Sequence, residues 1–344
     1  MIKISDGNIL RSEAEAFVNT VNCVGFMGKG IALQFKKAYP DNYEAYKRAC
    51  SAGQVKPGYM FIFETNSLIN PKYIINFPTK RHWKGDSRLE DIREGIKALI
   101  KDVRHLGIQS IAVPPLGCGL GGLQWNVVRP MIEKAFGELP TVKVLLFEPH
   151  GAPDAKTMPV HTKYPKMTIA RALFIKMMER YNQNSYRLTL LEMQKLAYFL
   201  QEAGEPLKLK YDAGFYGPYA PNLNKVLEIL EGHYIRGYGD TQKPDVEIEL
   251  MPNAVKEANK FLDTHTSKID LLSRVTDSIE GFETPYGMEL LSSVHWVAKH
   301  TPSPANSAEE AISKIHAWND RKRNMFQHKH IIVAWKQLRD QAWL

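Results

Sequence analysis

Residues 16–36, AFVNTVNCVGFMGKGIALQFK, contain a short apolar run, a loop with three glycines and the start of an amphipathic segment. The run AFVNTV is typical of a buried strand. Residues 28–50 predict one helix, with Leu33 and Phe35 among its apolar positions. Glycine lets backbone N–H groups approach an anion closely, and a helix N-terminus adds partial positive charge. The stretch therefore predicts an α/β unit whose loop, residues 25–30, could hold an anion.

A second stretch repeats this arrangement. SIAVPPL (110–116) predicts a strand, NVVRPMIEKAFGEL (126–139) predicts a helix, and the glycine-rich loop GCGLGG (117–122) lies between them. Ligands of parallel sheets bind outside the carboxyl ends of the strands. Two such loops could therefore hold a diphosphate from both sides, and tight turns without a ligand are the alternative.

The remainder of the first 150 residues alternates in the same way. Residues 87–107 predict an amphipathic helix, with a capping box formed by Ser87 and Glu90 at its start and Gly107 at its end. Further strands are predicted at residues 2–5, 58–65, 72–78 and 143–149. This alternation predicts a three-layer α/β domain with a mixed, largely parallel sheet and helices on both faces.

The second loop matches the pattern GxGxxG, yet a dinucleotide-binding Rossmann domain fits the chain badly. That pattern belongs on the first strand–helix turn, and an acidic residue should follow about 20 positions later. Here the loop is late in the domain, position 142 is Val142, and the nearest acid at a strand end is Glu148. The P-loop pattern is absent as well.

Composition is that of a folded globular protein, with 44% hydrophobic and 24% charged residues. No apolar run is long enough for a membrane span, the N-terminus has no signal-peptide pattern, and the three cysteines form no CxxC pair. We expect a cytoplasmic protein with no membrane partner. The eleven histidines lack the spacing of a zinc site, so we also expect no metal.

Charge is uneven along the chain. Residues 1–150 carry 20 Lys and Arg against 14 Asp and Glu, a net charge of +6 out of the total of +8. This excess favours a polyanionic partner or a phosphate-bearing ligand, although many domains are mildly basic without either.

Residues 151–168 contain three prolines and no periodicity, so we expect a linker at residues 153–167 between a first domain, 1–152, and a second domain, 168–344. The second domain is expected to be mainly α-helical. Its predicted helices are residues 168–183, 188–204, 221–232 and a long stretch from Ala308 onward, with one strand-like segment at residues 207–217.

Several motifs of the first domain together resemble the macrodomain, the ADP-ribose-binding α/β fold. Residues 16–36 resemble its ligand loop, GNIL (7–10) its adenine motif, and PPLGCGLGGLQW (114–125) the second phosphate loop of the subgroup that includes terminal ADP-ribose protein glycohydrolase. NFPTKRHWKGDSRLEDI (76–92) is more similar still to the DarG family, bacterial antitoxins that remove ADP-ribose from DNA and are paired with DarT toxins. The resemblance covers residues 1–150.

This resemblance implies a role for each matching residue, with ADP-ribose as the bound product and no cofactor. Asn8 and Ile9 would contact adenine, and Asn22 the distal ribose. The other implied contacts lie in the two phosphate loops and beside them: Gly28, Lys29, Gly30, Ile31, Thr79, Pro115, Gly117, Cys118, Gly119, Leu120, Gly121 and Gly122. Two positions depart from the pattern. Many macrodomains have Asp where this chain has Asn8, and the human-type glycohydrolase has an aspartate where this chain has Gly121.

The strand-like run at residues 72–78 is followed by a cluster of cations. The resemblance implies that Lys80 is the catalytic lysine and reaches the anomeric carbon of the distal ribose. A neutral amine could attack that carbon and form a covalent intermediate, whereas an ammonium group could stabilise or protonate the departing base. The covalent route is the one implied by the family, but it lacks the aspartate at Gly121. A phosphate clamp or a surface lysine is the alternative.

Arg81, His82, Trp83 and Lys84 interleave cations with an aromatic ring. Such a stretch suits single-stranded DNA, because the cations pair with phosphates and the indole stacks on a base. The alternative is that Trp83 anchors the loop in the core and the charges are solvated.

In the second half, LTLLEMQKLAYFLQ (188–201) followed by DAGFYGPYAPNL (212–223) resembles the Panacea or SocA-like antitoxin domain, which implies toxin binding rather than catalysis. Phe215 and Tyr216 lie in a rigid aromatic turn that could be an interface anchor, but we expect both in the core. The final segment, residues 330–344, should pack on its own domain.

The sequence thus predicts an antitoxin that hydrolyses the N-glycosidic bond between ADP-ribose and a nucleobase, expected to be thymidine in single-stranded DNA. Its second domain would bind and neutralise the cognate DNA ADP-ribosyltransferase toxin. The alternatives are a non-catalytic ADP-ribose reader, an ADP-ribosyl-protein glycohydrolase, an O-acyl-ADP-ribose deacylase or a phosphatase on the same pocket, and a regulator that acts only through its second domain.

Overall fold

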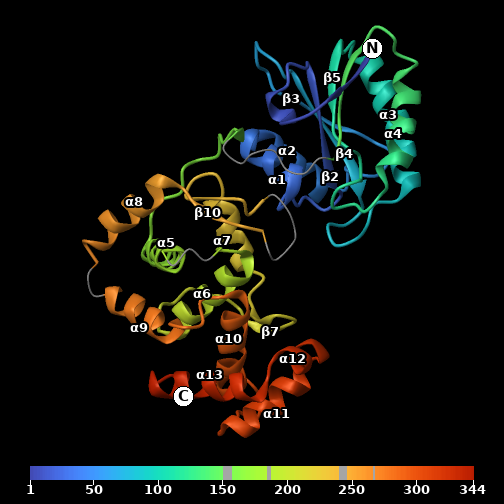
Figure 1. Cartoon of the computed structure of the whole chain (residues 1–344). Helices are drawn as coiled ribbons and strands as arrows, with labels where there is room; N and C mark the ends of the chain where they lie inside the picture. Colours follow the sequence, from blue (N-terminus) through green and yellow to red (C-terminus); the bar gives the residue numbers. More distant parts are fainter. Residues whose placement is uncertain (150–156, 184–186, 240–245, 266–267) are drawn as a thin grey trace. The chain divides into compact units, whose positions relative to one another are not determined.

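The computed structural model of the chain (Figure 1) describes residues 1–149, 157–183, 187–239, 246–265 and 268–344. The chain forms two compact units. The first comprises Met1–Lys163 together with Gly239, and the second begins at Tyr164. The division at 163/164 falls inside the predicted linker, of which residues 153–156 lie outside the described part.

The first unit contains a six-stranded sheet in the order β1-β6-β5-β2-β4-β3. Its strands are β1 (Ile2–Ser5), β2 (Ala16–Asn22), β3 (Phe61–Glu64), β4 (Tyr73–Lys80), β5 (Ser110–Val113) and β6 (Lys143–Phe147). Every neighbouring pair is parallel except β3–β4, which is antiparallel. The expected mixed, largely parallel sheet is confirmed.

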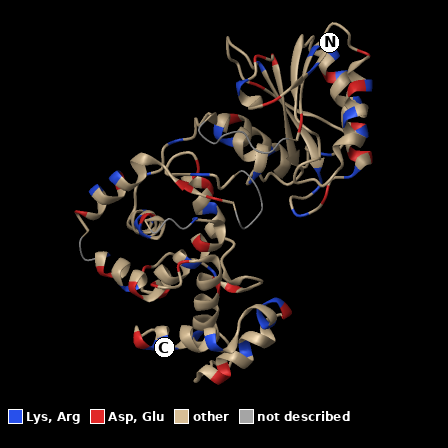
Figure 2. Ribbon diagram, viewed as in Figure 1, with Lys and Arg blue, Asp and Glu red and all other residues tan. Residues whose placement is uncertain are grey.

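Helices cover both faces of this sheet, as predicted. They are α1 (Gly30–Ala38), α2 (Pro40–Ser51), α3 (Leu89–His105) and α4 (Trp125–Phe136), with a short 3-10 turn at Ile9–Arg11. One core packs α3 and α4 against one face, and two smaller clusters pack α1 and α2 against the other. Both signs of charge lie along α3 and α4 (Figure 2), so the excess of Lys and Arg does not form a single basic face there.

Two local predictions in this unit are wrong. The single helix expected at residues 28–50 is two helices that divide at Tyr39, because Pro40 lacks an N–H group and disfavours helical backbone in the residue before it. The capping box is also absent, since α3 begins after Arg88 without a side-chain cap. The Ser87 hydroxyl is instead buried, and it has no hydrogen-bond partner among the residues that the structure describes. Gly107 follows the end of α3 with a φ of +65°, as expected for a C-terminal cap.

Three buried asparagines connect the strands that carry the site. Asn76 of β4 donates to the Asn42 side chain of α2 at 2.7 Å and accepts from Asn19 of β2 at 2.9 Å. Buried polar groups require such partners, and a network of them favours one packing arrangement. The amides therefore fix β2, β4 and α2 relative to one another.

The second unit is mainly helical, as expected. Its elements are α5 (Ile169–Asn182), α6 (Leu190–Glu202), β7 (Asp212–Gly214), β8 (Gly217–Tyr219), α7 (Leu223–Leu230), β9 (Ile235–Arg236), β10 (Glu249–Leu250), α8 (Pro252–Leu262), α9 (Ile269–Ile279), α10 (Pro285–Lys299), α11 (Ala308–Trp318), α12 (Asp320–Met325) and α13 (His328–Asp340). The final helix packs on α10 of its own unit, as expected. No helix in the described ranges is both long and apolar enough to cross a membrane.

The strand-like segment at residues 207–217 contributes to a hairpin, β7–β8, whose tip carries Phe215 and Tyr216. These rings are 56% and 37% exposed, so the prediction that they belong to the core is wrong. The two residues form the turn between Gly214 and Gly217, and their side chains project from it. Arg321 covers them, with its guanidinium carbon 4.7 Å from the Tyr216 ring centre and 5.8 Å from that of Phe215.

Buried charges lie beneath this hairpin. Lys322 and Glu289 are almost fully buried and pair at 2.7 Å, and Glu289 also accepts from Arg321 at 2.6 and 2.9 Å. Lys195, likewise buried, donates to the carbonyl of Pro218 in β8 at 2.7 Å. Burial and the neighbouring Lys322 lower the pKa of Lys195 to about 7. The position of the exposed tip thus depends on charged side chains in the core.

Candidate active site

Three parallel neighbours, β5, β2 and β4, end at the same edge of the sheet. We call residues 23–29, after β2, the first glycine loop, and residues 114–124, after β5, the second glycine loop. Lys80 is the last residue of β4 and pairs with Asn22, the last residue of β2, across a register shift. The fold therefore brings the predicted catalytic lysine and both predicted phosphate loops to one edge.

The two loops meet beside Lys80. A Cβ atom on Gly30 would lie 3.3 Å from Cδ1 of Leu120, so the Leu120 side chain packs against the start of α1. The Lys80 amine donates a hydrogen bond to the carbonyl of Leu120. Gly30 has a φ of +57°, a conformation that favours glycine.

The second glycine loop is a series of tight turns. Cys118 donates to the carbonyl of Pro115, Gly122 to that of Gly119, and Leu123 to that of Gly117, each at 3.0–3.1 Å. Within the described part of the chain, the N–H groups of Gly119, Leu120 and Gly121 have no hydrogen-bond partner. Consecutive N–H groups of this kind form an anion-binding site.

Ser87 fills the space beside Gly121. The Ser87 N–H donates to the Gly121 carbonyl at 3.0 Å. A Cβ atom on Gly121 would lie 2.3 Å from the Ser87 Oγ and 2.4 Å from the carbonyl oxygen of Gly117. The loop in this conformation excludes any side chain at residue 121, which gives a physical reason for the missing aspartate.

The charge state of Lys80 is set by opposing effects. Burial lowers the pKa of its amine below the usual value, and the nearby negative charge of Asp86 raises it in part. The effect of burial is the larger one, so the pKa of Lys80 is lowered overall. Burial thus increases the neutral, nucleophilic fraction of the amine. Cys118 is no rival nucleophile, because burial raises the pKa of its thiol to about 11.

Residues 81–84 are all exposed, and Arg81 also pairs with a residue of α3. Arg81 donates to both carboxylate oxygens of Asp91 on α3, at 3.1 and 3.0 Å. The pair joins the end of β4 to α3, and the contact of Arg81 with DNA stays a prediction. His82, Trp83 and Lys84 are exposed. Phe26, in the first glycine loop, lies 5.6 Å from Trp83 between ring centres, a neighbour that no periodic pattern in the sequence indicated.

Asn22 and Thr79 have structural contacts that the sequence did not indicate. The Asn22 side chain accepts from the N–H groups of Val24 at 3.0 Å and Phe26 at 3.3 Å, and it donates to the Phe26 carbonyl. It therefore shapes the first glycine loop. Thr79 is buried, and its hydroxyl donates to the carbonyl of Val21 at 3.4 Å.

The residues expected at adenine lie at the 3-10 turn after β1. The Asn8 side chain caps this turn by accepting from Leu10 N–H at 2.9 Å, and its amide donates to the carbonyl of Thr157 at 3.3 Å. Ile9 is buried in the core beneath. The Asn8 side chain thus links the turn to the segment that follows β6.

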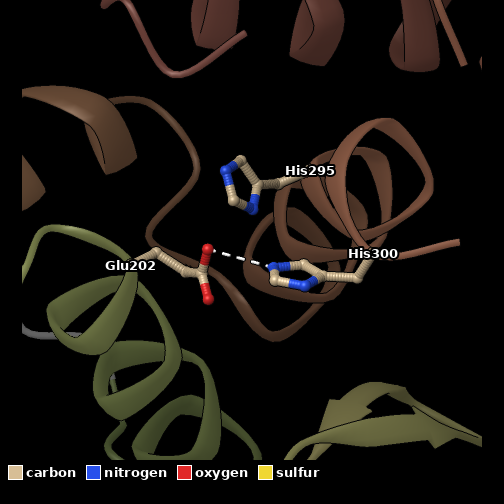
Figure 3. Close-up of side chains that lie close together, drawn as sticks. All are labelled: Glu202, His295 and His300. Carbon is tan, nitrogen blue, oxygen red and sulfur yellow. Dashed lines mark hydrogen bonds and ion pairs between the residues drawn. The ribbon is translucent and has the colours of Figure 1, made fainter. Parts of the chain in front are cut away.

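One group of side chains in the second unit could in principle hold a metal ion: Glu202, His295 and His300 (Figure 3). One polar atom of each residue has a hydrogen-bond partner. The Nε2 of His300 lies 3.0 Å from Glu202 Oε2, and Nδ1 of His295 lies 2.7 Å from the Tyr198 hydroxyl. Burial lowers the pKa of His295 to about 3, so its ring is neutral. The expectation that the chain binds no metal stays a prediction.

The first unit is similar to known macrodomain proteins. Residues 18–132 match the family model described as Macro domain. The macrodomain of Mycobacterium tuberculosis DarG is 52% identical over 43% of this chain and 98% of its own, with a TM-score of 0.43. A fusion protein of Thermosipho africanus, named DNA ADP-ribosyl transferase-DNA ADP-ribosyl glycohydrolase, is 31% identical over 46% of this chain and 45% of its own.

Two relatives match nearly the full length of both chains, including the second unit. The DNA ADP-ribosyl glycohydrolase of Thermus aquaticus is 46% identical, over 97% of this chain and 92% of its own. The protein of the same name from Mycobacterium tuberculosis is 40% identical, over 97% and 98%. With this identity along both units, the chain belongs to the family of DNA ADP-ribosyl glycohydrolases.

Proposed function

We propose that this chain is an antitoxin that removes ADP-ribose from a DNA base, and that Lys80 carries out the central step. The observation that carries the proposal is the position of the Lys80 amine, hydrogen-bonded to Leu120 where the two glycine loops meet. The loops would bind the diphosphate of ADP-ribose through backbone N–H groups. The distal ribose would then lie toward Lys80.

In the proposed reaction, the neutral amine of Lys80 attacks the anomeric carbon as the N-glycosidic bond breaks. The departing base takes the bonding electrons and receives the proton that the amine loses. Burial supports this route, because it lowers the pKa of Lys80 and so increases the neutral fraction. The modified base is proposed to be that of thymidine in single-stranded DNA.

Water must then release ADP-ribose from Lys80, and Asp86 is proposed to assist it. Ser87 excludes a carboxylate from residue 121, but the hydrogen bond between Ser87 and Gly121 places residue 86 next to that loop. Asp86 also acts electrostatically on Lys80. As the water oxygen bonds to the anomeric carbon, Asp86 accepts a water proton, and the lysine nitrogen leaves and regains one.

The test compares Lys80→Ala with Lys97→Ala, a matched exposed lysine on α3. Lys80→Ala should abolish release of ADP-ribose from a modified thymidine-containing oligonucleotide, while the Kd for ADP-ribose stays within about tenfold, or about 1.4 kcal/mol. Lys97→Ala should behave as wild type. Undiminished release by Lys80→Ala would refute the assigned role. Binding without release by the wild type would identify a reader, and release from ADP-ribosylated protein or acylated ADP-ribose alone would identify the other enzymes.

We also propose that the second unit binds the cognate DNA ADP-ribosyltransferase toxin through the hairpin tip. Exposed aromatic rings held beside an arginine are typical anchors of protein interfaces, and Phe215 and Tyr216 with Arg321 match that description. Phe215→Ala should weaken capture of the purified toxin at least tenfold without changing release of ADP-ribose. Unchanged affinity in both Phe215→Ala and Tyr216→Ala would exclude this surface.

A further inference from the structure

Phe26 and Trp83 form a pair of exposed rings next to the proposed catalytic lysine. Their centres are 5.6 Å apart with an angle of 38° between the planes. Phe26 belongs to the first glycine loop, and Trp83 follows Lys80 by three residues, so segments far apart in sequence contribute the two rings. The side chains are 38% and 43% exposed, and the alternative in which Trp83 anchors the loop in the core is therefore wrong.

His82 extends the same aromatic surface. Its ring stacks on Trp83 at 5.4 Å between centres and 29° between planes. The Lys84 amine lies 5.1 Å from the centre of the Trp83 ring, and the Lys84 N–H donates to Nδ1 of His82 at 3.2 Å. We call Phe26, His82 and Trp83 the aromatic platform. The positively charged Lys84 amine lies beside this platform.

Polar contacts fix the platform from both sides. The Asn22 side chain bonds both the N–H and the carbonyl of Phe26. On the other side, Arg81 forms its two hydrogen bonds with Asp91 immediately before His82 and Trp83. A surface that is ordered before its ligand arrives loses less entropy on binding. Such ordering of exposed rings suggests a binding role rather than incidental exposure.

We infer that the aromatic platform stacks an unpaired nucleobase adjacent to the ADP-ribosylated nucleotide, and so selects single-stranded DNA. This inference rests on the proposed function. Every base has a flat face that stacks on aromatic side chains, and that face is accessible only when the base is unpaired and unstacked. Lys84 supplies a charge for the neighbouring phosphate. The platform acts on the DNA chain beside the reacting nucleotide and takes no part in bond cleavage.

The experiment measures kcat/KM for release of ADP-ribose from two substrates. One is an ADP-ribosylated single-stranded oligonucleotide, and the other is ADP-ribosylated thymidine nucleoside, which has no neighbouring base. The expected result is that Trp83→Ala and Phe26→Ala each lower the ratio of oligonucleotide to nucleoside kcat/KM by about tenfold, mainly through KM. Trp83→Phe, which keeps a ring, should restore most of the ratio. Leu68→Ala, at a fully exposed apolar side chain between β3 and β4, is the control.

The outcomes separate this inference from the proposed function. An unchanged ratio in both alanine variants overturns the platform, as does an equal loss on both substrates in variants that remain folded. A wild type that prefers an ADP-ribosylated peptide to the oligonucleotide overturns it in favour of a protein partner. If the wild type releases ADP-ribose from neither DNA substrate, the proposed function itself has failed. Annealing the modified strand to its complement should lower wild-type kcat/KM if bases must be unpaired.

Discussion

The Ser87 N–H donates to the Gly121 carbonyl at 3.0 Å, and the Ser87 hydroxyl lies where a side chain at residue 121 would have to go. Ser87, two residues before α3, therefore determines which side chains the second glycine loop can carry. In this conformation the loop leaves no room for a carboxylate at residue 121. In the proposed reaction, release of ADP-ribose from Lys80 would then depend on another group of this chain.

Gly121→Ala should lower the free energy of unfolding by about 1–3 kcal/mol, because the added methyl group overpacks the contact with Ser87 and Gly117. It should also weaken ADP-ribose binding, since the loop must shift. Gly119→Ala is the matched control, because a Cβ atom there meets nothing within 4 Å. Urea unfolding and titration calorimetry measure both effects, and equal results for the two variants would contradict the packing argument.

The rate of ADP-ribose release should rise with pH. The neutral amine of Lys80 is the proposed attacking form, and its pKa is lowered by burial, so the rise should be complete at a lower pH than for a free lysine. Asp86→Asn removes the negative charge that raises this pKa, and it should move the midpoint of kcat/KM to a still lower pH. A profile that falls with rising pH would instead indicate the ammonium form.

Asp86→Asn should also cause the Lys80 adduct to accumulate, because attack by the amine continues while its hydrolysis slows. Intact-protein mass spectrometry during turnover should detect the chain carrying one ADP-ribose, and Lys80→Ala should prevent this. Glu90→Gln, which removes an exposed acid on α3, serves as the control. Wild-type turnover in Asp86→Asn, or a total loss of activity without an adduct, would exclude Asp86 from the hydrolytic step.

Lys322→Met should destabilise the second unit by about 3–5 kcal/mol, because it leaves Glu289 buried with only Arg321 as a charged partner. The double variant Lys322→Met with Glu289→Leu should recover part of this loss, since the buried carboxylate that Lys322 pairs with is then removed as well. Denaturant unfolding followed by circular dichroism measures both. A double variant less stable than the sum of its single changes would contradict this account.

His295 should make the second unit sensitive to acid. Burial lowers its pKa to about 3, whereas the unfolded chain has the ordinary value near 6.5. Between these values the unfolded chain binds a proton that the folded chain does not, so stability falls as pH decreases, by about 1.4 kcal/mol per pH unit at most. His295→Gln should reduce this slope, and the exposed His328→Gln should not. Identical slopes in all three proteins would refute the assignment.

The fold and the position of Lys80 beside the two glycine loops were predictable because they rest on local patterns. Alternating strands and helices predicted the sheet, and glycine loops after β2 and β5 predicted where an anion would bind. The break at Tyr39 was missed, although Pro40 follows it in the sequence. What sequence reasoning missed depends on contacts between distant segments. Arg81 with Asp91, Phe26 with Trp83, and Ser87 with Gly121 become neighbours only when separate strand ends and α3 meet at one edge.

In the second unit, too, the sequence did not indicate contacts between distant segments. Helices α8, α9 and α10 were not predicted, and the exposure of Phe215 and Tyr216 could not be read from an aromatic turn alone. Exposed and buried aromatic turns have the same composition, and only packing distinguishes them. In this unit the hairpin is held outside the helical core by Lys195, Arg321 and the chain around Gly217. This packing leaves both rings exposed.

The contacts of Lys195 and Arg321 with the hairpin have a practical consequence for anyone who wishes to imitate it with a short peptide. Its strands, β7 and β8, have three residues each, and much of its shape comes from the buried Lys195 and from Arg321, which is held by Glu289. A synthetic copy of residues 212–219 would keep the rings but lose what orients them. A useful decoy would have to be cyclised, or grafted onto a scaffold that supplies an equivalent arginine.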